Sequence, residues 1–288
     1  MEVAIMGKGF VGTATKYFLE QYCKDTVSKI HVEDPGYGMF IDDYDWSRVK
    51  YTFICVPTDN DGVNNHLNLS ILMQALQRAK GIPVIRSTVG PDSLITLAMA
   101  VNHDIPLMHW PEFLREKHWQ ADVDDDSIPI VIGGKEDMTN TFVNSLLPHK
   151  NINFNRTIIE CSVREASLMK ISRNAMLAAK VAQFNMLYDL CKEHKCSYEL
   201  IKEFFKQDGT LGQTHMDVPG HDGGRGFGGK CLPKDTKHYE QLFKEHNLCS
   251  MYCSRSGKLF KSTFSRSIIS KLSLRFPNKY LNVFLIFL

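Results

Sequence analysis

Short apolar runs alternate with stretches of helical hydrophobic spacing from the N-terminus to about residue 150. The helical patterns cover Val11–Tyr22, Leu69–Ala79 and Ser93–Val101. The apolar runs predict strands at Val3–Met6, Ile30–Val32, Thr52–Val56, Pro83–Arg86, Ile105–Met108 and Ile128–Ile132. Because strands and helices alternate, we expect an α/β fold with a doubly wound, Rossmann-type parallel sheet.

The pattern changes at Ile158. From there to Lys195 the chain contains no proline or glycine, and its apolar residues recur at helical spacing. This predicts one long helix of the kind that joins domains or forms a dimer interface. Shorter helices are predicted at Tyr198–Lys206 and Pro233–Glu245. The loop between them, Gln207–Gly229, holds eight glycines, and a loop this long is usually functional or disordered.

These patterns divide the chain into three predicted parts. They are an α/β domain over 1–156, a small helical domain over 157–247 and a basic, Ser-rich tail over 248–288 that is truncated or atypical. The formal net charge of +2 from 34 basic and 32 acidic residues gives no support for nucleic-acid binding. No acidic residue follows Glu245, so an anionic partner for the tail is a weaker alternative to a solvated end.

Cysteine usage and the start of the chain indicate a cytoplasmic protein. The eight cysteines are scattered without the pair spacing of metal sites, so we expect reduced thiols and no metal. The opening MEVAIMGKGF reads as a strand rather than a signal peptide. No apolar run approaches the roughly 20 residues of a membrane span.

A glycine motif follows the first predicted strand. Gly7-Lys-Gly9-Phe-Val-Gly12 stands between a strand and a helix, as a dinucleotide-binding turn requires. Pyrophosphate would lie on the free N–H groups at the helix start. Asp34 ends the second strand, where a carboxylate that binds a ribose hydroxyl favours NAD over NADP, and Glu33 is the alternative. The other interpretation is a glycine turn common to any α/β domain.

A second motif is Gly226-Phe-Gly-Gly-Lys-Cys231-Leu-Pro-Lys-Asp235. Pro233 suits the first turn of a helix, which puts Cys231 at the helix N-terminus. The helix dipole and the flanking lysines predict a lowered thiol pKa and a nucleophilic thiolate. Asp235 lies one turn on. The alternative is a structural cysteine after a loop.

Two further pairs are candidates for chemistry. Lys170 and Asn174 share a face of the long helix and could bind an oxyanion and a water. Glu112 and Glu116 follow a strand at the carboxyl edge of the sheet, where ligands bind, and could serve as acid or base. The alternatives are a solvated surface pair and ordinary helix-start acids.

The chain resembles the UDP-glucose/GDP-mannose dehydrogenase family. The matching stretches, in the family's order and over roughly residues 1–245, are GKGFVG, FICVPT, RSTVG, PEFLRE, EASLMKISRNAMLAAK and GFGGKCLPKD. The resemblance implies a Rossmann domain, a long dimerising helix and a C-terminal nucleotide domain, of which little would remain after Asn247. Lys230 stands where the family usually has a small residue, and Met186 where an acid is common.

The resemblance also implies catalytic roles. Cys231 would form a thiohemiacetal and then a thioester. Lys170 would stabilise oxyanions, with Asn174 beside it. Asp235 would orient water or act as a base, and Glu116 would assist thioester hydrolysis.

Thr88 would lie near the nicotinamide and a catalytic water. The residues implied to bind the cofactor are Gly7, Gly9, Phe10, Val11, Gly12, Asp34, Thr58 and Thr88. Those implied to bind substrate are Glu112, Phe113, Leu114, Arg115, Lys170, Asn174, Gly226, Phe227, Gly228 and Gly229.

The activity that the resemblance implies is oxidation of the C6 alcohol of a nucleotide sugar to a carboxylate, with reduction of two NAD. UDP-glucose, which gives UDP-glucuronate for polysaccharide biosynthesis, is the first expectation, and a homodimer through the long helix is the expected assembly. The alternatives are a GDP-mannose 6-dehydrogenase and a truncated, non-catalytic NAD-binding dimer.

Overall fold

A computed structural model describes residues 1–39, 46–62, 66–101, 107–147, 154–246 and 248. They fold as two compact units. The first contains Met1–Ala178 and Gly228–Gln241, and the second contains Ala179–Phe227 and the chain from Leu242. The predicted tail lies, apart from Leu248, outside the described residues. The division at residues 156 and 247 stays a prediction.

The first unit is built on a seven-stranded sheet with the order β2-β1-β3-β4-β5-β6-β7. The strands are β1 (Glu2–Met6), β2 (Lys29–Glu33), β3 (Val49–Ile54), β4 (Ile82–Ile85), β5 (Met108–His109), β6 (Ile130–Gly133) and β7 (Ile158–Cys161). Every neighbouring pair is parallel except β5 and β6, which pair antiparallel at His109 and Gly133. The predicted α/β class is therefore confirmed, with one antiparallel contact in a sheet expected to be wholly parallel.

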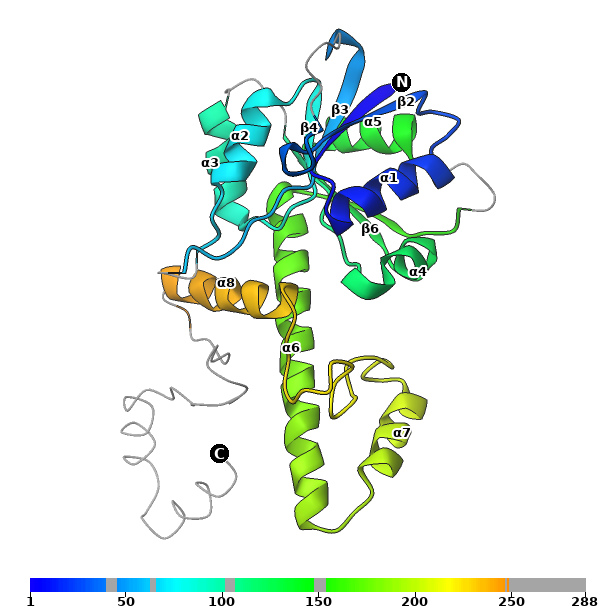
Figure 1. The fold of residues 1–288 in the computed structure, drawn as a ribbon, viewed down its shortest axis with the longest axis vertical. Coiled ribbons are helices and arrows are strands. Elements are labelled where there is room, and N and C mark those ends of the chain that lie inside the picture. The colour runs from blue at the N-terminus through cyan, green and yellow to red at the C-terminus, as the bar shows by residue number, and fades with distance from the viewer. Residues whose placement is uncertain (40–45, 63–65, 102–106, 148–153, 247, 249–288) are drawn as a thin grey trace. The chain divides into compact units, whose positions relative to one another are not determined.

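Helices cover both faces of this sheet (Figure 1). They are α1 (Phe10–Tyr22), α2 (Ser70–Arg78), α3 (Pro91–Val101), α4 (Trp119–Asp124) and α5 (Glu136–Leu146), with short 3-10 turns η1 (Pro35–Tyr37), η2 (Trp46–Arg48) and η3 (Glu116–His118). One core joins Val3, Ile5 and Phe53 of the sheet to α1, α4 and α5. A second core joins Met6 and Ile54 to α2 and α3. Neighbouring residues of a strand, such as Ile5 and Met6, thus pack into the cores on opposite faces of the sheet, because successive side chains of a strand point to opposite faces.

The long helix begins later than its hydrophobic pattern predicts. Residues Ile158–Cys161 form β7, which pairs with β6 in parallel, and only then does α6 (Val163–Glu193) start. Ser162 and Glu165 form a capping box: the Ser162 backbone N–H donates to Glu165 Oε2 at 2.8 Å, and the Glu165 N–H donates to Ser162 Oγ at 3.3 Å. Sheet pairing therefore overrides the expected helix over 158–161.

The second unit contains the C-terminal part of α6, α7 (Tyr198–Asp208) and the glycine-rich loop, together with the chain from Leu242. Its core contains Phe184, Cys191, Tyr198, Met216 and Val218. Ser197 caps α7 by accepting the Leu200 N–H, and the Tyr198 hydroxyl donates to the Met216 carbonyl oxygen. The helix predicted at Tyr198–Lys206 is thus present, and the loop is fixed to it by buried side chains.

The remaining differences from prediction are local. The sequence patterns missed α4, α5 and β7, and the strand expected at Ile105–Met108 is partly outside the described residues. The last helix, α8 (Cys231–Glu245), starts two residues before its predicted start. Over the described residues, no helix combines the length and apolarity needed to cross a bilayer.

Candidate active site

The glycine turn between β1 and α1 has the geometry that its spacing predicts. Gly7 has φ +97°, and a Cβ at Gly12 would lie 1.9 Å from the Gly7 carbonyl oxygen. Both positions therefore require glycine, the first for its conformation and the second for space. A Cβ at Gly9 would meet no described atom within 4 Å. Gly9 thus leaves open the side of the turn from which a pyrophosphate would approach.

Glu33 is the last residue of β2 and Asp34 follows it, and the two acids have different environments. Asp34 Oδ2 accepts the Lys8 N–H at 2.6 Å, so this carboxylate stands directly beside the glycine turn. Glu33 is buried and pairs with Arg78 at 3.0 Å. Of the two acids, Asp34 is the one whose position suits a ribose, because Glu33 is buried and already paired with Arg78.

The other residues predicted to hold the cofactor lie around the same edge. Phe10 and Val11 open α1 behind Gly9. Thr58 is buried after β3, and its hydroxyl donates to the Thr88 carbonyl oxygen at 2.7 Å. The carboxyl ends of β3 and β4 are thereby joined next to β1, which is where a doubly wound fold binds dinucleotides.

The long helix brings Lys170 to Glu112. Lys170 Nζ lies 2.8 Å from Glu112 Oε1, with 4% and 6% of the two side chains exposed. Glu112 Oε2 accepts the Leu114 N–H at 2.7 Å. Lys170 is thus an interior cation with a fixed counter-ion, which excludes the solvated-surface interpretation of the Lys170–Asn174 pair.

Asn174 and α8 complete the cluster. The Asn174 amide donates to Asp235 Oδ2 at 2.6 Å, and Lys234 Nζ lies 2.8 Å from Asp235 Oδ1. Asp235 is fully buried. Cys231 is half-buried on the first turn of α8 and interacts electrostatically with Lys170, Glu112, Asp235 and Lys234. Segments from three distant parts of the sequence therefore meet in one unit.

The predicted lowering of the Cys231 pKa is wrong. Burial raises the pKa of the Cys231 thiol, and Glu112 and Asp235 raise it further, whereas Lys170 and Lys234 lower it. Burial is the largest of these effects, so it sets the direction of the shift. The free thiol is consequently the stable form at neutral pH, and thiolate formation needs a base or a higher pH.

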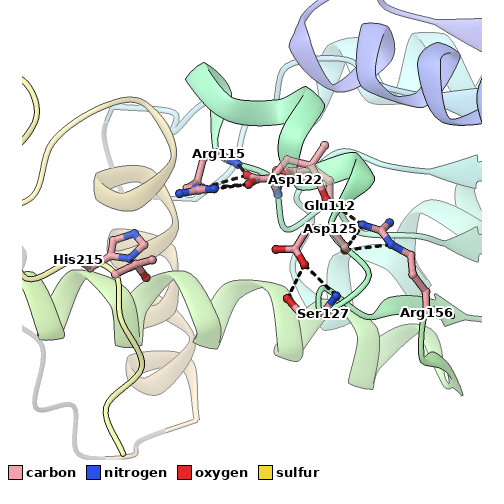
Figure 2. Close-up of polar contacts among 9 residues, drawn as sticks. Glu112, Arg115, Asp122, Asp125, Ser127, Arg156 and His215 are labelled. Carbon is pink, nitrogen blue, oxygen red and sulfur yellow. Dashed lines mark hydrogen bonds and ion pairs between the residues drawn. The ribbon is translucent and has the colours of Figure 1, made fainter. Parts of the chain in front are cut away.

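The PEFLRE segment separates its two glutamates. Glu112 is buried, whereas Glu116 is exposed in η3 and makes no hydrogen bond or ion pair with the described residues. The Arg115 guanidinium faces the Asp122 carboxylate (Figure 2), and Asp122 Oδ2 also accepts the Arg115 N–H at 2.6 Å. Of these side chains only Glu112 joins the Lys170 cluster.

The aromatic and glycine residues predicted to hold the sugar fall in both units. Phe113 is buried in the first unit, with Lys170 Nζ 5.9 Å from its ring centroid. Leu114 is half-buried after it. Gly226 and Phe227 belong to the second unit, where Asn185 Oδ1 accepts the Gly226 N–H at 3.0 Å. Gly228 and Gly229 belong to the first and lead into Cys231.

Arg86 is a residue that the sequence patterns missed. It follows β4 and is buried, and its Nη1 donates to the Trp110 carbonyl oxygen at 3.1 Å. Burial lowers its pKa to about 10. With Glu112 and Arg156 it lines a cavity of about 30 Å³. The available signal was a charged residue at the end of an otherwise apolar strand, in the motif RSTVG.

A family model places this site among known proteins. Residues 164–259 match the central domain of the UDP-glucose/GDP-mannose dehydrogenase family. The chain is a relative of the UDP-glucose/GDP-mannose dehydrogenase family. The resemblance predicted from the motifs is thereby confirmed. The matched part of the dehydrogenase model contains Lys170, Asn174, Cys231 and Asp235, whereas Glu112 and the glycine turn precede it.

Individual dehydrogenases are similar over longer stretches. UDP-glucose 6-dehydrogenase YwqF of Bacillus subtilis (strain 168) is 31% identical over 211 residues, which are 68% of this chain and 45% of the relative. UDP-glucose 6-dehydrogenase AglM of Haloferax volcanii is 25% identical over 283 residues, covering 82% of this chain and 64% of the relative. The chain thus spans less than two thirds of the length of these dehydrogenases.

Solved structures of nucleotide-sugar dehydrogenases share the fold. A UDP-glucose dehydrogenase from Pyrobaculum islandicum has a TM-score of 0.69 at 22% identity, over 86% of this chain and 65% of the other. A GDP-mannose dehydrogenase from Pseudomonas aeruginosa has a TM-score of 0.57 at 22% identity, over 86% and 66%. Both dehydrogenase structures have the fold described above, and neither distinguishes the sugar.

Proposed function

We propose that this protein is an NAD-dependent nucleotide-sugar 6-dehydrogenase that converts UDP-glucose to UDP-glucuronate. The observation that carries the proposal is the cluster of Cys231, Lys170, Glu112, Asn174 and Asp235 within the unit that also holds the glycine turn. A nucleophile, a buried cation, an amide and two carboxylates are the groups that oxidation of an alcohol through a thioester requires.

The residues around the glycine turn fit NAD. Gly7 and Gly12 accept no side chain, Gly9 is open, and Asp34 stands beside Lys8 with a carboxylate that would repel a 2′-phosphate. Gly7, Gly9, Gly12 and Asp34 would hold the dinucleotide. When bound, NAD would accept a hydride from the C6 carbon in each of the two oxidations.

The buried cation and amide suit the developing charges of this chemistry. Lys170 would stabilise the alkoxide and then the tetrahedral oxyanions at C6, because its ammonium is held in place by Glu112 and is almost fully buried. Asn174 is fixed by Asp235 at 2.6 Å and would bind a substrate oxygen or a water.

Cys231 and Asp235 would carry the covalent steps. After the first oxidation, the Cys231 sulfur would add to the aldehyde carbon and the thiol proton would pass to a base, for which Asp235 is the candidate. Loss of the second hydride from the hemithioacetal leaves a thioester, and water then cleaves the C–S bond and returns the thiol. Per alcohol, one water is consumed, two NAD are reduced and three protons are released.

UDP-glucose is preferred over GDP-mannose because the two relatives described above, from Bacillus subtilis and Haloferax volcanii, are UDP-glucose 6-dehydrogenases. A homodimer through the central helix is part of the proposal. The exposed apolar residues of α6 that support it are Leu168, Met169, Met176, Met186 and Leu190. A cytoplasmic location stays a prediction.

The test is NADH formation by purified protein with NAD and either UDP-glucose or GDP-mannose, with C231S as the matched control. Turnover with UDP-glucose that is lost in C231S supports the proposal. Turnover with GDP-mannose but not with UDP-glucose would contradict the proposed substrate and identify GDP-mannose in its place. NAD binding without turnover on either sugar would contradict the enzymatic function and favour a non-catalytic NAD-binding protein. Sedimentation velocity on the same sample tests the dimer.

A further inference from the structure

Arg86 is a buried cation whose charge no described acid neutralises by contact. Its side chain is enclosed by the first unit, and over the described residues no carboxylate oxygen lies within ion-pairing distance of the guanidinium. Buried charges are usually paired, because desolvation of an isolated charge is unfavourable. Arg86 instead contacts two neutral acceptors and an aromatic ring. We therefore look for the role of this side chain in the segments that these contacts join.

The guanidinium joins α1 to the segment that carries Glu112. Arg86 Nε donates to Thr15 Oγ1 at 3.2 Å, and Nη1 donates to the Trp110 carbonyl oxygen at 3.1 Å. The guanidinium carbon lies 4.1 Å from the centroid of the Trp110 ring. Thr15 Oγ1 in turn donates to the Val11 carbonyl oxygen at 2.7 Å, one residue from Gly12. The planar fork therefore spans from the helix of the glycine turn to the end of β5.

Glu112 follows Trp110 by two residues and has little freedom of its own. One of its oxygens accepts from Lys170 and the other from the Leu114 N–H. The cavity of about 30 Å³ beside it is lined by Arg86 as well, whereas the Trp110 ring is packed against Phe18, Phe53 and Phe142. Loss of the Arg86 bond to the Trp110 carbonyl oxygen would free the main chain next to this cavity, and the distance between Glu112 and Lys170 would then change.

We propose that Arg86 is a positioning residue that fixes Glu112 against Lys170 and couples this pair to the helix of the glycine turn. The kinetic part of the inference rests on the proposed function. The geometric part does not, because the charge arrangement around Cys231 can be measured without turnover.

The readout is the pH dependence of Cys231 alkylation by iodoacetamide, followed by mass spectrometry of the Cys231 peptide. The charged groups that face this thiol are Lys170, Glu112, Asp235 and Lys234. Glu112 disfavours the thiolate, so E112Q is expected to move the alkylation midpoint to lower pH. R86K keeps the positive charge but loses the paired hydrogen bonds of the guanidinium to Thr15 and Trp110. A shift of the alkylation midpoint in R86K therefore reports a change in the positions of the charged groups, not the loss of a charge. We expect a shift in the same direction, by about half a pH unit or more.

A double-mutant cycle shows whether Arg86 acts through Glu112. R86K in the E112Q background should add no further shift. R156K is the matched control, because Arg156 lines the same cavity but donates to the carbonyl oxygens of Asp122 and Asp125 (Figure 2). R156K should leave the midpoint unchanged.

Two results would overturn the inference: a wild-type midpoint in folded R86K, or an equal shift with and without E112Q. If R86K does not fold, T15V removes one acceptor of the fork while leaving the charge, and a smaller shift to lower pH is expected from it.

If wild-type protein turns over UDP-glucose, R86K should lower kcat with unchanged NAD affinity. If wild-type protein does not turn over, the proposed function fails, but the alkylation cycle still decides the role of Arg86.

Discussion

The Lys170–Glu112 pair shows how the fold sets the chemistry of single residues. The two side chains are almost fully buried and 2.8 Å apart. Removing one partner of a buried pair usually costs about 3–5 kcal/mol, because the other charge is left desolvated. Substitutions at either position therefore change stability as well as the site, and kinetic data on them need an accompanying unfolding measurement.

C231S is expected to lower turnover by at least about 1,000-fold, because a serine hydroxyl does not replace the thiol in a thioester sequence. NAD affinity should stay at the wild-type value, since the glycine turn is untouched. Steady-state NADH formation and a fluorescence titration with NAD measure the two quantities. C196S, which changes an exposed cysteine of the second unit, is the control. Full turnover in C231S would exclude the covalent mechanism.

D34A is expected to weaken NAD binding by roughly 10- to 100-fold, because a hydrogen bond from a ribose hydroxyl to a carboxylate is lost. D34N, which keeps an acceptor for the Lys8 N–H, separates this loss from a disturbance of the turn. D25A, at an exposed acid after α1, is the control in a calorimetric titration. Unchanged affinity in D34A and D34N would exclude Asp34 as the ribose ligand.

At the scale of elements, the α1 and α6 starts are fixed by short-range contacts. The Ser162–Glu165 capping box starts α6 directly after β7. The glycine turn, by contrast, starts α1 without a side-chain cap. A turn without a cap leaves helix N–H groups free, and these are the groups that bind phosphate. The uncapped start of α1 therefore suits the phosphate-binding role proposed for the glycine turn.

The glycine turn gives a paired prediction. G12A should destabilise the protein, because its Cβ would lie 1.9 Å from the Gly7 carbonyl oxygen and backbone would have to move. G9A should fold with wild-type stability, since its Cβ meets no described atom and φ is −63°, but it should weaken NAD binding. Thermal unfolding and NAD titration of both variants test this. Equal melting temperatures, or wild-type affinity in G9A, would contradict the assignment of the turn.

At the scale of the whole molecule, the first unit carries a pH-sensitive residue in its sheet. His109 on β5 is fully buried, and its Nδ1 lies 3.0 Å from the Ile85 carbonyl oxygen, which can only accept. The ring is therefore the neutral Nδ1–H tautomer. Burial lowers the His109 pKa to about 3 from 6.5. Between these values the unfolded chain binds a proton that the folded chain does not.

The free energy of unfolding should consequently decrease as the pH is lowered below 6.5. From pH 7 to pH 5, His109 alone accounts for a loss of about 2 kcal/mol. H109Q keeps an amide donor but does not titrate, so its loss over the same range should be smaller by about that amount. Urea denaturation of both proteins at the two pH values measures the difference. Parallel losses in wild type and H109Q would show that His109 does not contribute.

The sequence alone determined features that depend on short-range geometry. The strands at Val3–Met6 and Thr52–Val56, the glycine turn and the helix over Tyr198–Lys206 follow from side-chain period, backbone conformation and the residues that flank each element. These interactions span a few residues, so one stretch of sequence specifies them. The same holds for Cys231 at a helix start.

Only the tertiary structure decided features that depend on distant neighbours. Residues 158–161 have a helical pattern but form β7, because β6 supplies backbone partners. Glu112 and Glu116 look alike in PEFLRE, yet only Glu112 meets Lys170, 58 residues away in the chain. The direction of the Cys231 pKa shift follows from burial and from four charges on three segments. Burial and long-range charge are properties of the packed chain, so no local pattern contains them.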